Sequence, residues 1–312
     1  MRGDWESSSP DAAYRFANKE NEVNVIKQTI EQLASADRCA YSPTGPWAAE
    51  PTALTCLALE IHNQHQPAIR LAKQLADAQD SNGSIGALAD HDTPAWPTSL
   101  AILAWLACAQ KAFADNIRRA VDWSLATYGK PADPTPQVGH DPSILGWSWA
   151  ADTHAWMEPT CMFVLALKAA GIGKHSRARE GERLIIDRLL PTGGSNYGST
   201  LVLGQATLPQ VQSTGLAMLA LAGEENSDPR VEASLKYLEE TLGPMTTTSS
   251  MCYGLLGLTA HNRRPPQADD FLQQSLEREV SRGTCEYKLA LISLAALKDL
   301  AIFPGVLPKV SV

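Results

Sequence analysis

The chain has 312 residues, of which 44% are hydrophobic and 19% are charged. This composition provides enough apolar surface to offset chain entropy, so a wholly disordered protein is excluded. The formal net charge is −8 and the isoelectric point is about 5.4, and no basic patch interrupts this acidic balance, which excludes a nucleic-acid-binding protein. We find neither a signal peptide nor about eighteen consecutive apolar residues, so we expect a cytoplasmic protein with reduced cysteines and no transmembrane helix.

Six segments each combine one apolar stripe with one charged face. This pattern predicts amphipathic helices on the outside of a larger assembly. A polar segment, residues 1–19, precedes the first of them, and we expect it to be flexible. The six segments are residues 21–34, 66–78, 116–128, 176–190, 228–242 and 268–280.

A second kind of segment alternates with the first and begins with a recurring phrase. Each copy continues into a run that is apolar on nearly every side, which predicts a buried helix. Two weaker copies begin near Thr248 and Thr284. The alternation predicts an all-α fold, an (α/α)6 toroid of about six inner and six outer helices over residues 20–303, followed by a tail at 304–312. The clear copies read Glu50-Pro-Thr-Ala-Leu, Trp96-Pro-Thr-Ser-Leu, Glu158-Pro-Thr-Cys-Met and Gln212-Ser-Thr-Gly-Leu.

Two long loops, residues 129–157 and 191–210, are rich in Trp, Tyr, Gly and Asn. Loops of this length usually carry function or disorder, and this composition favours ordered, cavity-facing structure. Both loops lead from an outer helix to the start of an inner one. We therefore expect most of the four rings of Trp147, Trp149, Trp156 and Tyr197 to share one pocket at that end. Further candidate substrate-binding residues are Trp47, Trp96 and Asn196.

The loop Gln79-Asp-Ser-Asn-Gly and the Pro-Thr-x-x-x-Leu-x-x-Leu helix starts resemble the prenyltransferase and squalene–hopene cyclase repeat. The stretches Gly146-Trp-Ser-Trp and Gly193-Gly-Ser-Asn-Tyr-Gly look like those of bacterial single-domain members. The resemblance covers residues 20–300. It implies a toroid that holds a polyprenyl or triterpenoid substrate and, in class II cyclases, a carboxylic acid that protonates an alkene.

The family's Asp-x-Asp-Asp-Thr-Ala motif is absent, as is the Asp-Asp-x-x-Asp metal motif. Glu50 and Glu158 occupy the position of the family's proton donor. Burial raises the pKa of a carboxyl group, and aromatic walls stabilise a carbocation. Glu158 is the main candidate because it follows the aromatic loop, with Asp152 and His154 nearby. The alternative for both glutamates is an anion that stabilises a helix N-terminus.

The same loop also contains candidate metal ligands. Zinc-binding residue types are present, but their spacing matches no zinc signature, so we expect neither a metal nor a cofactor. These residues are His140, Asp141, Asp152, His154 and Cys161. The pair Asp269-Asp270 begins an outer helix, where acidic side chains complement the helix dipole.

The main hypothesis for function is a terpene-cyclase-like protein whose partner is a hydrophobic isoprenoid, with peripheral contact to membranes. Two alternatives stay open. One is a non-catalytic toroid that binds an isoprenoid or a protein. The other is a carbohydrate-active (α/α)6 enzyme with paired carboxylates such as Asp152 and Glu158.

Overall fold

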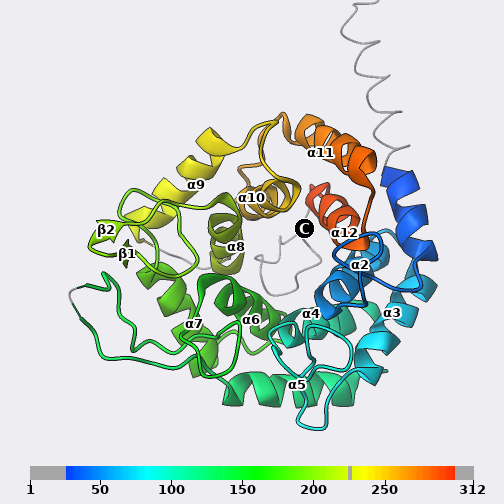
Figure 1. The fold of residues 1–312 in the computed structure, drawn as a ribbon, viewed down its shortest axis with the longest axis horizontal. Coiled ribbons are helices and arrows are strands. Elements are labelled where there is room, and N and C mark those ends of the chain that lie inside the picture. Colours follow the sequence, from blue (N-terminus) through cyan, green and yellow to red (C-terminus); the bar gives the residue numbers. More distant parts are fainter. Residues whose placement is uncertain (1–25, 136, 224–226, 299–312) are drawn as a thin grey trace, which may run out of the picture.

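Two concentric rings of helices form the protein (Figure 1). The computed structural model describes residues 26–135, 137–223 and 227–298. The predicted all-α toroid is confirmed. The inner ring contains α2 (Ala49–Ile61), α4 (Thr98–Ala109), α6 (Met157–Ala169), α8 (Val211–Leu221), α10 (Thr248–Ala260) and α12 (Glu286–Ala295). The outer ring contains the helical residues 26–35, α3 (His65–Asp77), α5 (Ala114–Ala126), α7 (Ser176–Asp187), α9 (Pro229–Thr241) and α11 (Ala268–Arg282).

The two kinds of sequence pattern account for the two rings. In α4 every residue from Thr98 to Trp105 is buried, because outer helices cover the side that faces away from the axis. In α3 only Ala68, Leu71, Ala72 and Leu75 are buried, and they form the single stripe that the spacing predicts. The predicted tails, residues 1–19 and 304–312, lie outside the described residues.

The inner ring is closed. Each inner helix packs against the next along the chain, and α12 packs against α2 (Figure 1). The first and last inner helices therefore support each other, although their sequences are more than 200 residues apart.

Two layers of apolar side chains fill the axis of the ring. Each inner helix supplies one residue to each layer, three positions apart, and the space left between them is about 20 Å³. That volume holds about one water molecule. The axis is thus a packed core with no room for a polyprenyl chain. The upper layer is Leu54, Leu100, Met162, Leu216, Tyr253 and Leu291, and the lower layer is Leu57, Leu103, Leu165, Leu219, Leu256 and Leu294.

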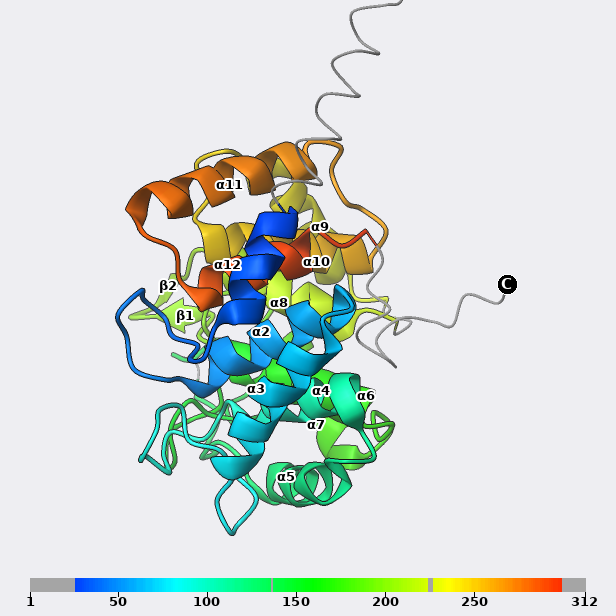
Figure 2. The same cartoon turned by 90° about the vertical axis from the view of Figure 1, so that its right-hand side faces the viewer.

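Long loops gather at one end of the ring, where the inner helices begin (Figure 2). We call this end the mouth. The repeated threonines fasten these loops: the hydroxyl oxygens of Thr98, Thr160 and Thr214 accept hydrogen bonds from the backbone N–H groups of Ile85, Trp147 and Ser195 at 2.8, 3.0 and 2.9 Å. The Thr of the repeated phrase therefore has a structural role in attaching each loop to its inner helix.

A short hairpin interrupts one of these loops. Strand β1 (Leu201–Val202) pairs with β2 (Gln205–Ala206) in antiparallel register. The turn residues Leu203 and Gly204 have φ values of 52° and 77°, the positive values that a type I′ turn requires. The sequence pattern shows no alternation long enough to predict these strands.

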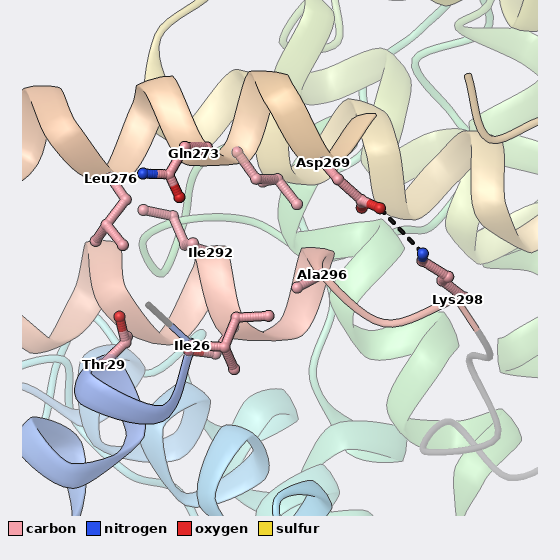
Figure 3. A pocket seen from close by; sticks show the side chains of 10 residues that line it. Ile26, Thr29, Asp269, Gln273, Leu276, Ile292, Ala296 and Lys298 are labelled. Carbon is pink, nitrogen blue, oxygen red and sulfur yellow. Dashed lines mark ion pairs between the residues drawn. The ribbon is translucent and has the colours of Figure 1, made fainter. Parts of the chain in front are cut away.

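A groove marks the seam where the outer ring meets itself, between residues 26–35, α11 and α12 (Figure 3). Its volume is about 200 Å³ and its walls are mostly apolar. At its edge the Asp269 carboxylate forms ion pairs with Lys298 at 3.0 Å and Arg264 at 2.9 Å. Asp269 and Asp270 lie in the first turn of α11, as predicted for residues that complement the helix dipole. Among the described helices, none is long and apolar enough to span a bilayer.

Candidate active site at the mouth

A layer of polar and aromatic residues caps the apolar axis at the mouth. Each member stands four positions before the upper-layer residue of its own repeat. Five of the six lie in the first turn of their inner helix, and Trp96 lies two residues before α4. Residues four apart share a helix face, so the five helical members look onto the same axis, whereas the ring of Trp96 packs against Trp149 in the wall of the ring. We call it the mouth layer. It consists of Glu50, Trp96, Glu158, Gln212, Ser249 and Tyr287.

Glu50 is buried, with 5% of its surface exposed. The hydroxyl of Tyr41 donates a 2.6 Å hydrogen bond to its Oε2 atom. Burial raises the pKa of Glu50 from 4.5 to about 7; the bond from Tyr41 opposes this change, the charge of Glu158 adds to it, and the charge of Lys288 opposes it. A carboxyl group with this pKa is about half protonated at pH 7, whereas an ordinary glutamate is almost fully ionised there.

Glu158 is buried to the same extent. The hydroxyl of Ser213 donates a 3.0 Å hydrogen bond to its Oε1 atom. Burial raises the pKa of Glu158, and hydrogen bonds from Ser213 and Gln212 oppose that rise. Glu158 therefore has two side-chain donors that favour its ionised form, whereas Glu50 has one.

Two further groups complete the site. Tyr253 takes the place that leucine or methionine holds in the upper layer, and its hydroxyl is buried without a hydrogen-bond partner among the described residues. Burial raises the pKa of Tyr253, and the charges of Tyr287, Glu50 and Glu158 add to this rise. The ammonium group of Lys288 donates a 2.8 Å hydrogen bond to the hydroxyl of Ser249.

The expectation of one shared aromatic pocket is met only in part. Trp147 and Trp149 line a common pocket with Trp96. Tyr197 is instead 49% exposed, and the ring of Trp156 packs against that of His154 in a tilted arrangement, with centroids 4.4 Å apart.

Trp147 belongs to the core more than to a surface pocket, since only 1% of it is exposed. Its ring stacks on Phe163 at 5.1 Å and its indole N–H donates to the carbonyl of Ser124 at 2.9 Å. The Arg177 guanidinium covers the ring at 4.3 Å. Gly181 leaves the space that the indole fills, because a Cβ there would lie 2.9 Å from the ring.

Other predicted site residues lie elsewhere. Asp152 stands on an exposed turn with a φ of 60° and lines the pocket of Trp96, Trp147 and Trp149. Asp152 is therefore outside the mouth layer, and the carboxyl group that shares this layer with Glu158 is that of Glu50. Asn196 holds its own loop: its amide donates to the carbonyl of Leu208 at 2.5 Å, and its oxygen accepts from the N–H of Tyr197 at 2.7 Å. Trp47 lines a separate acidic pocket of about 640 Å³.

The loop residues weighed for zinc do not form a metal site. His140 lies within 3.4 Å of the hydroxyl of Thr200, and burial lowers its pKa to about 4. Cys161 is buried inside α6. Within the described parts of the chain, no three His, Cys, Asp or Glu side chains are grouped so that they would hold a metal ion.

Sequence comparisons give no relative, since neither a family model nor a curated protein matches the chain. Solved structures do match. An α-amylase from Clostridium perfringens superimposes with a TM-score of 0.60 at 10% identity, over 88% of this chain and 96% of that one. A reducing-end-xylose releasing exo-oligoxylanase gives 0.55 at 11% identity, over 92% and 93%. A protein from Actinoplanes gives 0.54 at 13% identity, over 85% and 82%. At these identities the likeness establishes the fold alone.

Proposed function

We propose that the mouth is the active site of a carbohydrate-active enzyme that hydrolyses glycosidic bonds, with Glu50 and Glu158 as its acid and base. The observation that carries this proposal is the pair of buried carboxyl groups in one mouth layer, each with a raised pKa. Paired carboxyl groups in different environments are the usual machinery of glycoside hydrolysis. Two structures with this fold are named as an amylase and an oligoxylanase, which also supports a carbohydrate-active enzyme.

The two environments suggest the division of roles. Glu50, with a pKa of about 7, is the general acid: it donates its proton to the glycosidic oxygen as the bond from that oxygen to the anomeric carbon breaks. Glu158, with two donors on its carboxyl group, is the base: it takes a proton from the water that attacks the anomeric carbon. The sequence analysis favours Glu158 as the proton donor, so this assignment exchanges the roles of the two glutamates.

The helix arrangement favours an inverting reaction. Because α4 packs between α2 and α6, the two glutamates stand on helices that are not neighbours, which favours a wide separation of their carboxyl groups. An inverting enzyme needs about 6.5–9.5 Å between its carboxyl groups to admit a water molecule, against about 5–5.5 Å in a retaining enzyme. Proton NMR of the fresh product measures the anomeric configuration directly.

The terpene-cyclase hypothesis finds less support. It needs an apolar cavity for a polyprenyl chain in the centre of the toroid, and the two leucine-rich layers leave about 20 Å³ there. The resemblance of the repeated phrase is accounted for by loop attachment through threonines and by the packed axis, which are features of the fold.

The test is release of reducing sugar from a panel of soluble starch, xylan, mixed-linkage glucan and chitosan. We expect one substrate to be cleaved by the native protein, and Glu50→Gln and Glu158→Gln each to lower the rate by about 10²–10⁴-fold. Glu60→Gln is the matched control, since Glu60 lies at the other end of α2 and pairs with His65. Full activity in Glu50→Gln and Glu158→Gln contradicts the proposal, as does cleavage of no member of the panel.

A further inference from the structure

A pocket of about 390 Å³ lies in the wall of the ring between the loop that precedes α4, the end of α5, and α6 with the loop that precedes it. We call it the aromatic pocket. Its volume is within the range of about 300–1,000 Å³ that small-molecule sites occupy. Trp96 and Trp149 meet edge to face in its wall, with ring centroids 4.7 Å apart. Both indoles are half-buried, and Tyr128 at the rim is 55% exposed. Flat apolar surfaces are therefore available to a ligand.

Polar groups line the same pocket. Asp152 supplies a carboxylate on an exposed turn, and Thr127 and Ser148 supply hydroxyl groups. The hydrocarbon chain of an isoprenoid forms no hydrogen bonds with these groups, and the cost of desolvating them would weaken its binding. A sugar ring presents apolar C–H faces and a belt of hydroxyl groups, so it suits indole walls with polar groups at the edge. The carboxylate also disfavours uronic acids and other anionic sugars.

The aromatic pocket and the two glutamates lie at the same end of the ring, where the inner helices begin. Trp96 lines the pocket and stands in the mouth layer, at the position that Glu50 and Glu158 hold in their own repeats. The helix that follows it, α4, is the one between α2 and α6. The pocket and the glutamates therefore belong to three consecutive repeats of the ring.

We propose that the aromatic pocket is a subsite for one sugar ring of an uncharged oligosaccharide whose neighbouring glycosidic bond lies between Glu50 and Glu158. The proposal rests on the proposed function and extends it, since it makes the substrate a chain of several neutral sugars. Trp149 is its anchor, because its indole lines the pocket and packs on Trp96 without belonging to the mouth layer.

Binding of maltotetraose, xylotetraose, cellotetraose and, as a non-sugar probe, farnesol to the full chain tests the proposal by calorimetry and tryptophan fluorescence. Both the native protein and Glu158→Gln are titrated, so that turnover does not obscure binding. We expect one tetrasaccharide to bind, Trp149→Ala to weaken its binding at least about tenfold, and Trp149→Phe to weaken it less. Met245→Ala is the control, since Met245 is 90% exposed and does not line the pocket.

The outcomes separate the subsite from the catalytic proposal. Unchanged tetrasaccharide affinity in Trp149→Ala overturns the subsite, whether or not the protein cleaves sugars. Binding that depends on Trp149, without cleavage of that sugar by the native protein, supports the subsite and overturns the hydrolase. Binding of farnesol but of no tetrasaccharide overturns the subsite, and so does the absence of any binding.

Discussion

The hydroxyl of Tyr41 donates a 2.6 Å hydrogen bond to Glu50, while its ring meets the ring of Tyr287 at 5.1 Å. Tyr41 comes from the loop before the first inner helix, and Tyr287 from the last inner helix. One side chain thus joins a buried carboxyl group to the point where the ring closes. The position of Glu50 depends on ring closure as well as on its own helix.

Removing the Tyr41 hydroxyl should raise the pKa of Glu50 further above about 7, since the bond from Tyr41 lowers it. In Tyr41→Phe the alkaline limb of the pH–rate profile should move to higher pH, at a cost of about 1 kcal/mol in unfolding free energy. Tyr237→Phe is the matched control: it removes the hydrogen bond from a tyrosine of outer helix α9 to the carbonyl of Pro209. A profile that shifts equally in both variants, or in neither, contradicts the role of Tyr41.

Glu50→Gln should change how stability depends on pH. Between pH 4.5 and about 7 the folded chain keeps the Glu50 proton that the unfolded chain releases, so native stability falls as pH rises through this window. Because glutamine does not titrate, Glu50→Gln should be more stable than the native protein above pH 7, by up to about 3 kcal/mol. Urea unfolding at pH 4.5 and pH 8 measures the difference, with Glu60→Gln as baseline. A variant less stable than native at pH 8 would show an ionised, well-solvated Glu50.

Tyr253→Phe should separate stability from activity. The Tyr253 hydroxyl is buried and has no hydrogen-bond partner among the described residues, and an unsatisfied polar group costs about 1–3 kcal/mol. Its removal should leave the unfolding free energy unchanged or raise it by about 1 kcal/mol, and should lower kcat/KM on the cleaved polysaccharide. Thermal unfolding and initial rates provide the two readouts. A loss of stability, with full activity, would mean that the hydroxyl serves the fold only.

Gly181→Ala should destabilise the fold through Trp147. The added Cβ would lie 2.9 Å from the indole and 2.6 Å from the Val164 side chain, so it should cost about 1–3 kcal/mol. Gly243→Ala is the control, because its Cβ meets nothing within 4 Å. Equal urea midpoints for the two variants would refute the tight packing of Trp147.

Local pattern was enough to predict the toroid, because helix periodicity and the repeated phrase are properties of short segments. It also located Glu50 and Glu158, since both stand at the same repeat position. It missed Lys288, whose charge acts on Glu50 because α12 packs against α2. It also missed Tyr41, which lies in the loop before α2, outside the repeated phrase. Contacts made by ring closure leave no trace in short-range spacing.

The aromatic residues show a second limit of prediction from the sequence. Composition marks the loop before α6 as important, but it does not tell which rings face a ligand. Trp147 is a core residue because Gly181, on another helix, makes room for it. Trp149, two positions later, lines a pocket. That difference is set by packing partners distant in the chain.

The contact between α12 and α2 also restricts how such a protein can diversify. An open stack of repeats can grow by duplication of a unit, whereas a closed ring accommodates an added helix pair only if every packing angle changes. Variation is then confined to the connections, and those at the mouth are already long before α4, α6 and α8 and short before α10 and α12. Descendants of this chain would acquire new specificities through unequal loops around a ring of constant size.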